Sequence, residues 1–167
     1  RALGRLDESR AALERAAALA PADYAHAFEL GVLFEVLGRG EESIAHYERS
    51  AALRPGFATA HLAAGLQRYR RGDWAGAAER FRAVVALEPR HVEALVNLGF
   101  ALGEQGRHDE SLATLESAIR ADPSAASARH AMGWLMDRMG RPTEAAARYE
   151  EALARDPRHF ESLRALG

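Results

Sequence analysis

The 167-residue chain contains no cysteine and no lysine. Without cysteine it has neither a disulfide framework nor a thiolate metal site, which suits a periplasm as well as the cytoplasm, the compartment we favour. No apolar run reaches the roughly 18 residues that a membrane span needs, because Arg, Glu or Asp interrupts each one. The sequence therefore predicts no membrane-spanning segment.

The chain also lacks an excess of charge of either sign. Its 22 basic and 24 acidic residues are spread along the sequence and give a net charge of -2. Proteins that bind nucleic acids usually gather basic residues into one patch, so a nucleic acid is not an expected partner. With 48% hydrophobic residues the chain should fold. Its use of Arg alone and its many Ala residues are typical of GC-rich codon usage, which indicates a bacterial protein.

Proline and glycine recur at a fixed step of 34 residues, as from Pro21 to Pro55. Such a step is the mark of an internal repeat. Three ladders share it: Pro21, Pro55, Pro89, Pro123 and Pro157; Gly4, Gly38, Gly72, Gly106 and Gly140; and Gly31, Gly65, Gly99, Gly133 and Gly167.

Within one repeat the apolar residues predict two antiparallel helices. In residues 24–57 they recur at helical spacing up to Gly38, and a second amphipathic stretch follows and ends before Pro55. Gly31 falls inside the first helix, where glycine costs about 1 kcal/mol relative to Ala. We expect the missing side chain to let the second helix approach closely.

This pattern resembles the tetratricopeptide repeat family, whose repeat is a helix-turn-helix of 34 residues. The resemblance rests on small residues in the second helix, large apolar residues four positions later, and the proline ladder. It covers the whole chain and implies an all-α fold, an α-solenoid whose helix pairs stack into a right-handed superhelix. We expect one array, with the second helix of a partial repeat in 1–23, full repeats in 24–57, 58–91, 92–125 and 126–159, and the start of a further repeat in 160–167; the small residues are Ser43, Ala77, Ser111 and Ala145, and the large ones Tyr47, Phe81, Leu115 and Tyr149.

The chain departs from the family pattern only in the first helix of each repeat. At the position where the family often has Trp, the four repeats carry Ala27, His61, Leu95 and Arg129. Where Tyr is frequent they carry Phe34, Arg68, Leu102 and Met136. The second repeat is therefore the most irregular.

The resemblance implies that the first helices line a concave groove, and it predicts which residues face a partner. An apolar column runs through the four repeats, and contiguous apolar surfaces usually mark interaction sites. Phe100 and Trp134 are the expected anchors, with Gly103 expected to leave a gap for a guest side chain. The predicted partner-binding residues are Phe28, Val32, Leu62, Leu66, Tyr69, Val96, Asn97, Phe100, His130, Trp134 and Arg138.

Charged residues around the apolar column have mixed sign. Glu35, Arg70, Glu93, Glu104 and Asp137 join Arg138 as groups that could orient a ligand, with His91 and His159 facing inward from loops. Family members that grip a terminal carboxylate use Lys, Asn and Arg, and only Asn97 fills such a place, which disfavours that mode. The alternative that Phe28, Leu62 and Val96 merely pack between helices stays open.

Catalytic and metal-binding patterns are missing. The seven histidines show no H-E-x-x-H spacing, and every glycine of a possible phosphate loop has a place in the repeat. We therefore predict a non-enzymatic scaffold or adaptor for a protein or peptide segment, without metal or cofactor. Two alternatives stay open: a non-catalytic arm of a larger enzyme, such as a glycosyltransferase, or of a secretion or polymer-export protein, and head-to-tail self-association through uncapped ends.

Overall fold

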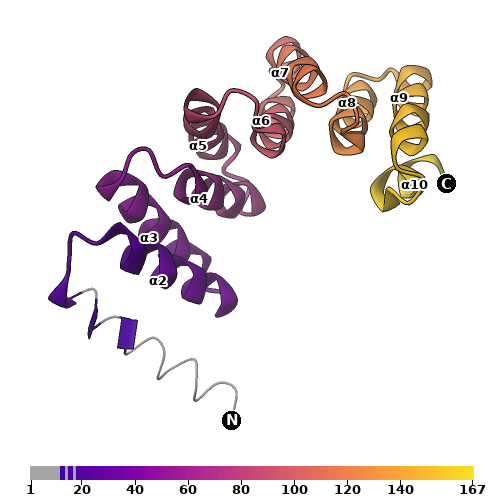
Figure 1. Ribbon diagram of the computed structural model, residues 1–167. Coiled ribbons are helices and arrows are strands. Elements are labelled where there is room, and N and C mark those ends of the chain that lie inside the picture. Colours follow the sequence, from indigo (N-terminus) through magenta and orange to yellow (C-terminus); the bar gives the residue numbers. More distant parts are fainter. Residues whose placement is uncertain (1–11, 14, 17) are drawn as a thin grey trace. The chain divides into compact units, whose positions relative to one another are not determined.

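The computed structural model describes residues 12–13, 15–16 and 18–167, and every regular element in this part of the chain is helical. The helix expected within residues 1–23 falls largely outside the described residues. The others are α2 (Tyr24–Val36), α3 (Gly40–Leu53), α4 (Ala58–Arg70), α5 (Trp74–Leu87), α6 (Val92–Glu104), α7 (His108–Ala121), α8 (Ala126–Arg138), α9 (Pro142–Arg155) and α10 (Phe160–Leu166). The helices follow one another along the chain (Figure 1), and the connections between them alternate between three and four residues.

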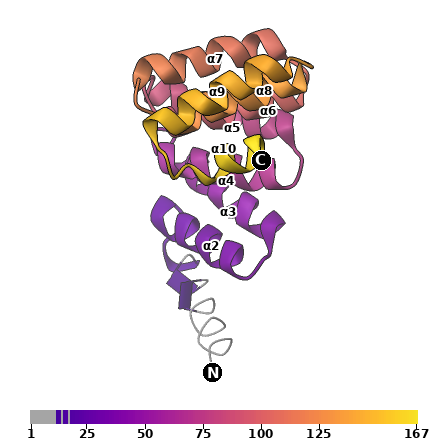
Figure 2. The same ribbon diagram turned by 90° about the vertical axis from the view of Figure 1, so that its right-hand side faces the viewer.

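The chain divides into two compact units, Arg1–Gly72 and Asp73–Gly167, which are described separately. In unit 1, α3 packs against both α2 and α4. In unit 2 each helix from α5 to α10 packs against the next, and α6 also packs against α8 (Figure 2). No helix in the described residues is long and apolar enough to cross a membrane.

The glycines inside the first helices are contact points for the second helices. A Cβ added to Gly31 would lie 2.5 Å from the Tyr47 ring, and one on Gly133 would lie 2.6 Å from the Tyr149 ring. Leu115 covers Gly99 in the same way, at 2.5 Å. Because real Cβ atoms do not approach this closely, each of these positions needs glycine. The predicted role of these glycines in helix packing is confirmed.

Small residues of the second helices complete these contacts. Ser43 donates its hydroxyl to the Gly31 carbonyl at 2.9 Å, and Ser111 donates to the Gly99 carbonyl at 2.7 Å. Both serines are fully buried. A buried hydroxyl needs such an acceptor, since an unpaired one would be costly. The small side chain therefore allows the close approach, and its hydroxyl fixes the position.

The turn glycines and the prolines end the helices for different reasons. Gly38, Gly72, Gly106 and Gly140 have φ between 70° and 78°, a left-handed conformation that favours glycine. The prolines instead keep the residue before them out of helical geometry. Arg54, before Pro55, accordingly has φ -136° and ψ 86°.

Candidate partner-binding site

The two expected anchors lie in contact on neighbouring helices of unit 2. The rings of Phe100 on α6 and Trp134 on α8 meet edge to face, with centroids 4.9 Å apart and an interplanar angle of 70°. Both side chains are half-buried. A Cβ on Gly103 would lie 2.6 Å from Cζ3 of Trp134. The gap expected beside Phe100 is therefore filled by Trp134, so that expectation was wrong.

A charge pair borders the aromatic pair. Arg138 donates to Oε2 of Glu104 at 2.8 Å, which joins the ends of α6 and α8. The Arg138 guanidinium carbon also lies 5.6 Å from the centre of the Trp134 ring, within the range of a cation–π contact. Arg138 is thus held by two neighbours while its side chain stays 46% exposed.

Two hydrogen-bonding groups near the aromatic pair have no protein partner. Neither the side-chain amide of Asn97, one turn before Phe100 on α6, nor the indole N–H of Trp134 is hydrogen-bonded to another described residue. Neither group is fully buried. They can therefore bond to a ligand without losing an existing bond. We call Asn97, Phe100, Glu104, Trp134 and Arg138 the α6/α8 surface.

Two other predicted residues of unit 2 have contacts of a different kind. Val96 is 6% exposed and belongs to the hydrophobic core. His130 is half-buried, with Nδ1 3.1 Å from Oγ of Ser162 and its ring 5.3 Å from that of Tyr149 and 5.2 Å from that of His159. Burial lowers the pKa of His130, and the neighbouring His159 lowers it further. The structure therefore places Val96 in the core and packs the half-buried His130 against α10.

The five predicted residues of unit 1 differ in how far their side chains are exposed. Phe28 packs with Tyr47 and Phe57, each ring pair 5.2 Å apart, and is half-buried in this cluster. Val32 is 40% exposed. The other three side chains, all on α4, are half-buried: Leu62, Leu66 and Tyr69. A continuous apolar column through both units stays a prediction.

Several groups expected to orient a ligand instead hold the fold together. Tyr47 donates its hydroxyl to Glu35 at 2.8 Å, and Tyr149 donates to Asp137 at 2.7 Å. Arg70 also donates to Glu35, at 2.7 Å. Partial burial raises the pKa of Glu35, but the bonds from Arg70 and Tyr47 outweigh it, so the pKa lies below its ordinary value.

The loop histidines are helix caps. Nδ1 of His91 accepts from the Ala94 N–H that follows it in α6, at 3.3 Å. Nδ1 of His159 lies at the same distance from the Ser162 N–H at the start of α10. Such caps satisfy backbone donors that a helix cannot pair internally. The described residues contain no group of three His, Asp or Glu side chains that could hold a metal ion. Glu93, another group expected to orient a ligand, is exposed in the first turn of α6.

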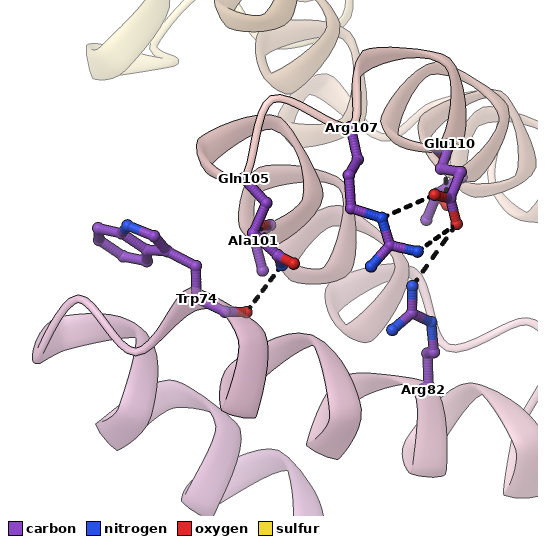
Figure 3. Close-up of polar contacts among 7 residues, drawn as sticks. Trp74, Arg82, Ala101, Gln105, Arg107 and Glu110 are labelled. Carbon is purple, nitrogen blue, oxygen red and sulfur yellow. Dashed lines mark hydrogen bonds and ion pairs between the residues drawn. The ribbon is translucent and has the colours of Figure 1, made fainter.

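A polar network on the α5, α6 and α7 side of unit 2 was not foreseen from the sequence (Figure 3). Gln105, the C-cap of α6, donates to the carbonyl oxygens of Trp74 at 3.0 Å and Ala101 at 2.8 Å. Arg107 forms two hydrogen bonds to Glu110 at 2.7 Å, and Arg82 lies 3.6 Å from the same carboxylate. The bond from Gln105 to Trp74 ties the end of α6, the helix that carries Phe100, to the start of α5. The ion pair between Arg82 and Glu110 links α5 to α7.

Comparison with known proteins identifies the family. The tetratricopeptide repeat model matches residues 1–56, 62–126 and 130–167, and the chain belongs to this family. Its all-α architecture is that of a tetratricopeptide solenoid. Membership of this family fits a protein-interaction scaffold. No curated protein sequence matches the chain.

Solved structures share the fold at low sequence identity. The crystal structure of MamA protein is 20% identical in sequence, and the match covers 95% of this chain and 86% of the MamA chain with a TM-score of 0.82. MamA from Desulfovibrio magneticus RS-1 is 19% identical, covers 94% and 89%, and also has a TM-score of 0.82. TTC0263, a thermophilic TPR protein of Thermus thermophilus, is 23% identical, covers 98% and 90%, and has a TM-score of 0.71. At these identities the likeness shows the fold alone.

Proposed function

We propose that the chain is a non-catalytic scaffold that binds an extended or helical segment of a partner protein on its α6/α8 surface. The observation that carries this proposal is the contact between Phe100 and Trp134, together with two hydrogen-bonding groups of this surface that have no partner among the described residues. Trp is among the residues most enriched where binding energy concentrates. An aromatic pair of this kind supplies apolar contact area, and Asn97 and the indole N–H supply hydrogen bonds to a peptide backbone.

The surface is held in place before a partner arrives. The Trp134 ring lies on Gly103 and against Phe100, and Arg138 is fixed by Glu104. Binding then costs little side-chain entropy, because few rotamers remain to be ordered. The exposed Arg138 and its half-buried partner Glu104 form a polar border, which contributes more to partner choice than to affinity.

A capture experiment from native lysate tests the proposal. The double variant Phe100→Ala/Trp134→Ala is compared with the wild type and with Phe160→Ala, which removes a 67% exposed aromatic ring elsewhere in unit 2. Circular dichroism first establishes that all three proteins are helical. We expect specific proteins to bind wild type and Phe160→Ala but not the double variant, since a true anchor contributes about 2 kcal/mol or more. Capture of the same proteins by all three would refute the proposal.

Self-association is a second candidate function, and α10 is the observation that favours it. Phe160, Leu163 and Leu166 are 67%, 49% and 42% exposed along this helix. Contact with a second copy would cover these side chains. Light scattering coupled to size exclusion should then show a concentration-dependent oligomer that Leu163→Asp abolishes and Phe100→Ala/Trp134→Ala leaves intact. A monomer at all concentrations would rule out this candidate.

A further inference from the structure

Unit 2 contains a pocket that lies apart from the residues of the α6/α8 surface. It has a volume of about 380 Å³ and is lined by Arg129 of α8 and by Glu151, Ala154 and Arg155 of α9. Two of its four lining residues are arginines. No residue of the α6/α8 surface lines it.

Arg129 is the unusual member of this pocket because it is buried and forms no ion pair with a described residue, although its charge acts on Asp122 at longer range. It is 8% exposed, and its one hydrogen bond within the described chain runs from Nη1 to the Ala125 carbonyl at 3.2 Å. A guanidinium has five N–H donors, and a buried charge is costly unless it is paired. The pocket is where an acceptor for the remaining donors can enter.

Glu151, which lines the pocket with Arg129, and Asp122, on which the charge of Arg129 acts, both already have hydrogen-bond partners. Glu151 receives Nη1 of Arg148 at both oxygens, at 2.8 and 2.9 Å. Asp122 accepts from the backbone and the hydroxyl of Ser124, at 2.8 and 2.7 Å. Neither forms an ion pair with Arg129. Two arginines, Arg129 and Arg155, and one acid, Glu151, line the pocket, which leaves its lining with a net positive charge.

Arg68 of unit 1 shows how this chain otherwise accommodates an arginine in a first helix. Its Nε and Nη2 donate to Oε1 of Glu48 at 2.9 and 2.7 Å. Arg68 thus has an internal carboxylate, although it is more exposed than Arg129. Arg129 lacks the carboxylate acceptor that Glu48 provides for Arg68.

Packing of the repeat does not explain Arg129 either. Leu95 holds the same place one repeat earlier and is 4% exposed within the hydrophobic core. The α7 residues in register with Glu151, Ala154 and Arg155 are Ser117, Arg120 and Ala121, so the preceding repeat has its charge at the place of Ala154 and none at the places of Glu151 and Arg155. An apolar residue therefore satisfies the fold at this position. The arginine adds a group that the fold does not need.

We infer that this pocket binds a carboxylate group, supplied by an acidic side chain of a partner protein. The planar guanidinium of Arg129 can bond both oxygens of a carboxylate, as arginine does in bidentate pairs. Arg155, exposed at the end of α9, adds a second positive charge at the opening. A bound carboxylate would accept the hydrogen bonds that no described residue accepts from Arg129. This inference does not depend on the α6/α8 surface.

A titration of the full chain with sodium glutarate at constant ionic strength tests the inference. The NMR signals of the arginine Nε–H groups monitor the titration. We expect the Arg129 signal to shift and saturate in the wild type, and Arg155→Gln to weaken glutarate binding. In Arg129→Gln the affinity should fall about tenfold or more, the effect of losing a charge-assisted bond. Arg158→Gln is the matched control, because it removes an exposed charge nearby and should leave binding unchanged.

Two further arms keep the test decisive. If Arg129→Gln does not fold, Arg129→Leu replaces it, since Leu95 occupies the same register position. Inorganic phosphate is titrated in parallel, and a saturable phosphate response without a glutarate response would overturn the carboxylate assignment. The inference is also overturned if glutarate shifts no arginine signal saturably, or if Arg129→Gln and Arg158→Gln bind it equally well.

Discussion

The helix pairs α2/α3 and α8/α9 share one set of internal contacts and differ at other positions. In both, a tyrosine ring of the second helix lies on a glycine of the first, Tyr47 on Gly31 and Tyr149 on Gly133. In both, the tyrosine hydroxyl reaches an acid on the first helix, at 2.8 and 2.7 Å. The same internal contacts thus recur 102 residues apart, since 149 − 47 equals 102.

Outside these contacts the two pairs differ at several positions, some of them buried. Where α2 has Ala27 and Val32, α8 has Arg129 and Trp134. The comparison teaches that the repeat constrains the glycine and tyrosine positions and leaves other positions free to vary. We therefore look for function where the two pairs differ, and for stability where they agree.

Truncating the shared tyrosines should have the largest effect. Tyr47 and Tyr149 are 2% and 4% exposed, so Tyr47→Ala or Tyr149→Ala removes a buried ring and leaves a cavity. We expect each to lower the free energy of unfolding by about 3–5 kcal/mol, as for other large aromatic residues. Urea denaturation followed by circular dichroism measures this. A large loss for one tyrosine and almost none for the other would show that the two pairs are not equivalent.

Adding a methyl group to the shared glycines should have the next largest effect. Gly31→Ala and Gly133→Ala place a Cβ at 2.5 and 2.6 Å from ring carbons. Overpacking of this kind typically costs about 1–3 kcal/mol, which exceeds the gain of about 1 kcal/mol in helix propensity.

The matched control for the glycine variants is Gly56→Ala. Nothing lies within 4 Å of a Cβ at Gly56, and its φ is not positive. Thermal unfolding should therefore show no loss of stability for this variant. Equal stability of Gly31→Ala and the wild type would contradict the packing role of Gly31.

Acidification should affect the α2/α3 pair through Glu35, which Arg70 and Tyr47 both bond. Because the folded-state pKa of Glu35 is lowered, its contribution to stability is present above the unfolded-state value of 4.5. It is lost as the pH falls through the folded-state pKa. Glu35→Gln should remove this pH dependence, with an effect below about 1 kcal/mol because the pair is partly solvated. An unchanged pH profile of urea denaturation in Glu35→Gln would contradict this assignment.

The smallest change in stability is expected where the pairs differ most, at Arg129. Replacing a buried charge that lacks a partner by an apolar residue is often neutral or stabilising. Arg129→Leu should therefore either leave the melting temperature within about a degree of the wild-type value or raise it. Differential scanning calorimetry in a chloride buffer without carboxylates checks this. A marked loss of stability would assign Arg129 a structural role.

The repeat made much of the fold predictable from the sequence. The turn glycines and the prolines located the helix ends, because positive φ and the restriction before proline act locally. The glycines inside the first helices predicted close packing, because a costly residue in a helix needs a reason. These inferences hold for residues such as Gly31 and Gly99, whose surroundings the repeat itself determines.

The candidate site was less predictable because its contacts depend on rotamers and on neighbours from other repeats. Gly103 suggested a gap, but the Trp134 ring from the next repeat fills it. Asp137 was expected to orient a ligand, yet its carboxylate accepts a hydrogen bond from the Tyr149 hydroxyl. Arg129 was visible as a departure from the family pattern. Its burial and lack of a partner could be seen only in the structure.

Fluorescence of Trp134 tests the central claim, partner binding on the α6/α8 surface, most directly. The chain has two tryptophans, so Trp74→Phe leaves Trp134 as the single emitter. When a partner recovered by the capture experiment is added, we expect the emission to shift to shorter wavelength and saturate as the ring is covered. Phe100→Ala should weaken the measured Kd about 30-fold, the equivalent of about 2 kcal/mol. Saturable binding that leaves both the Trp134 emission and the Phe100→Ala affinity unchanged would contradict the account.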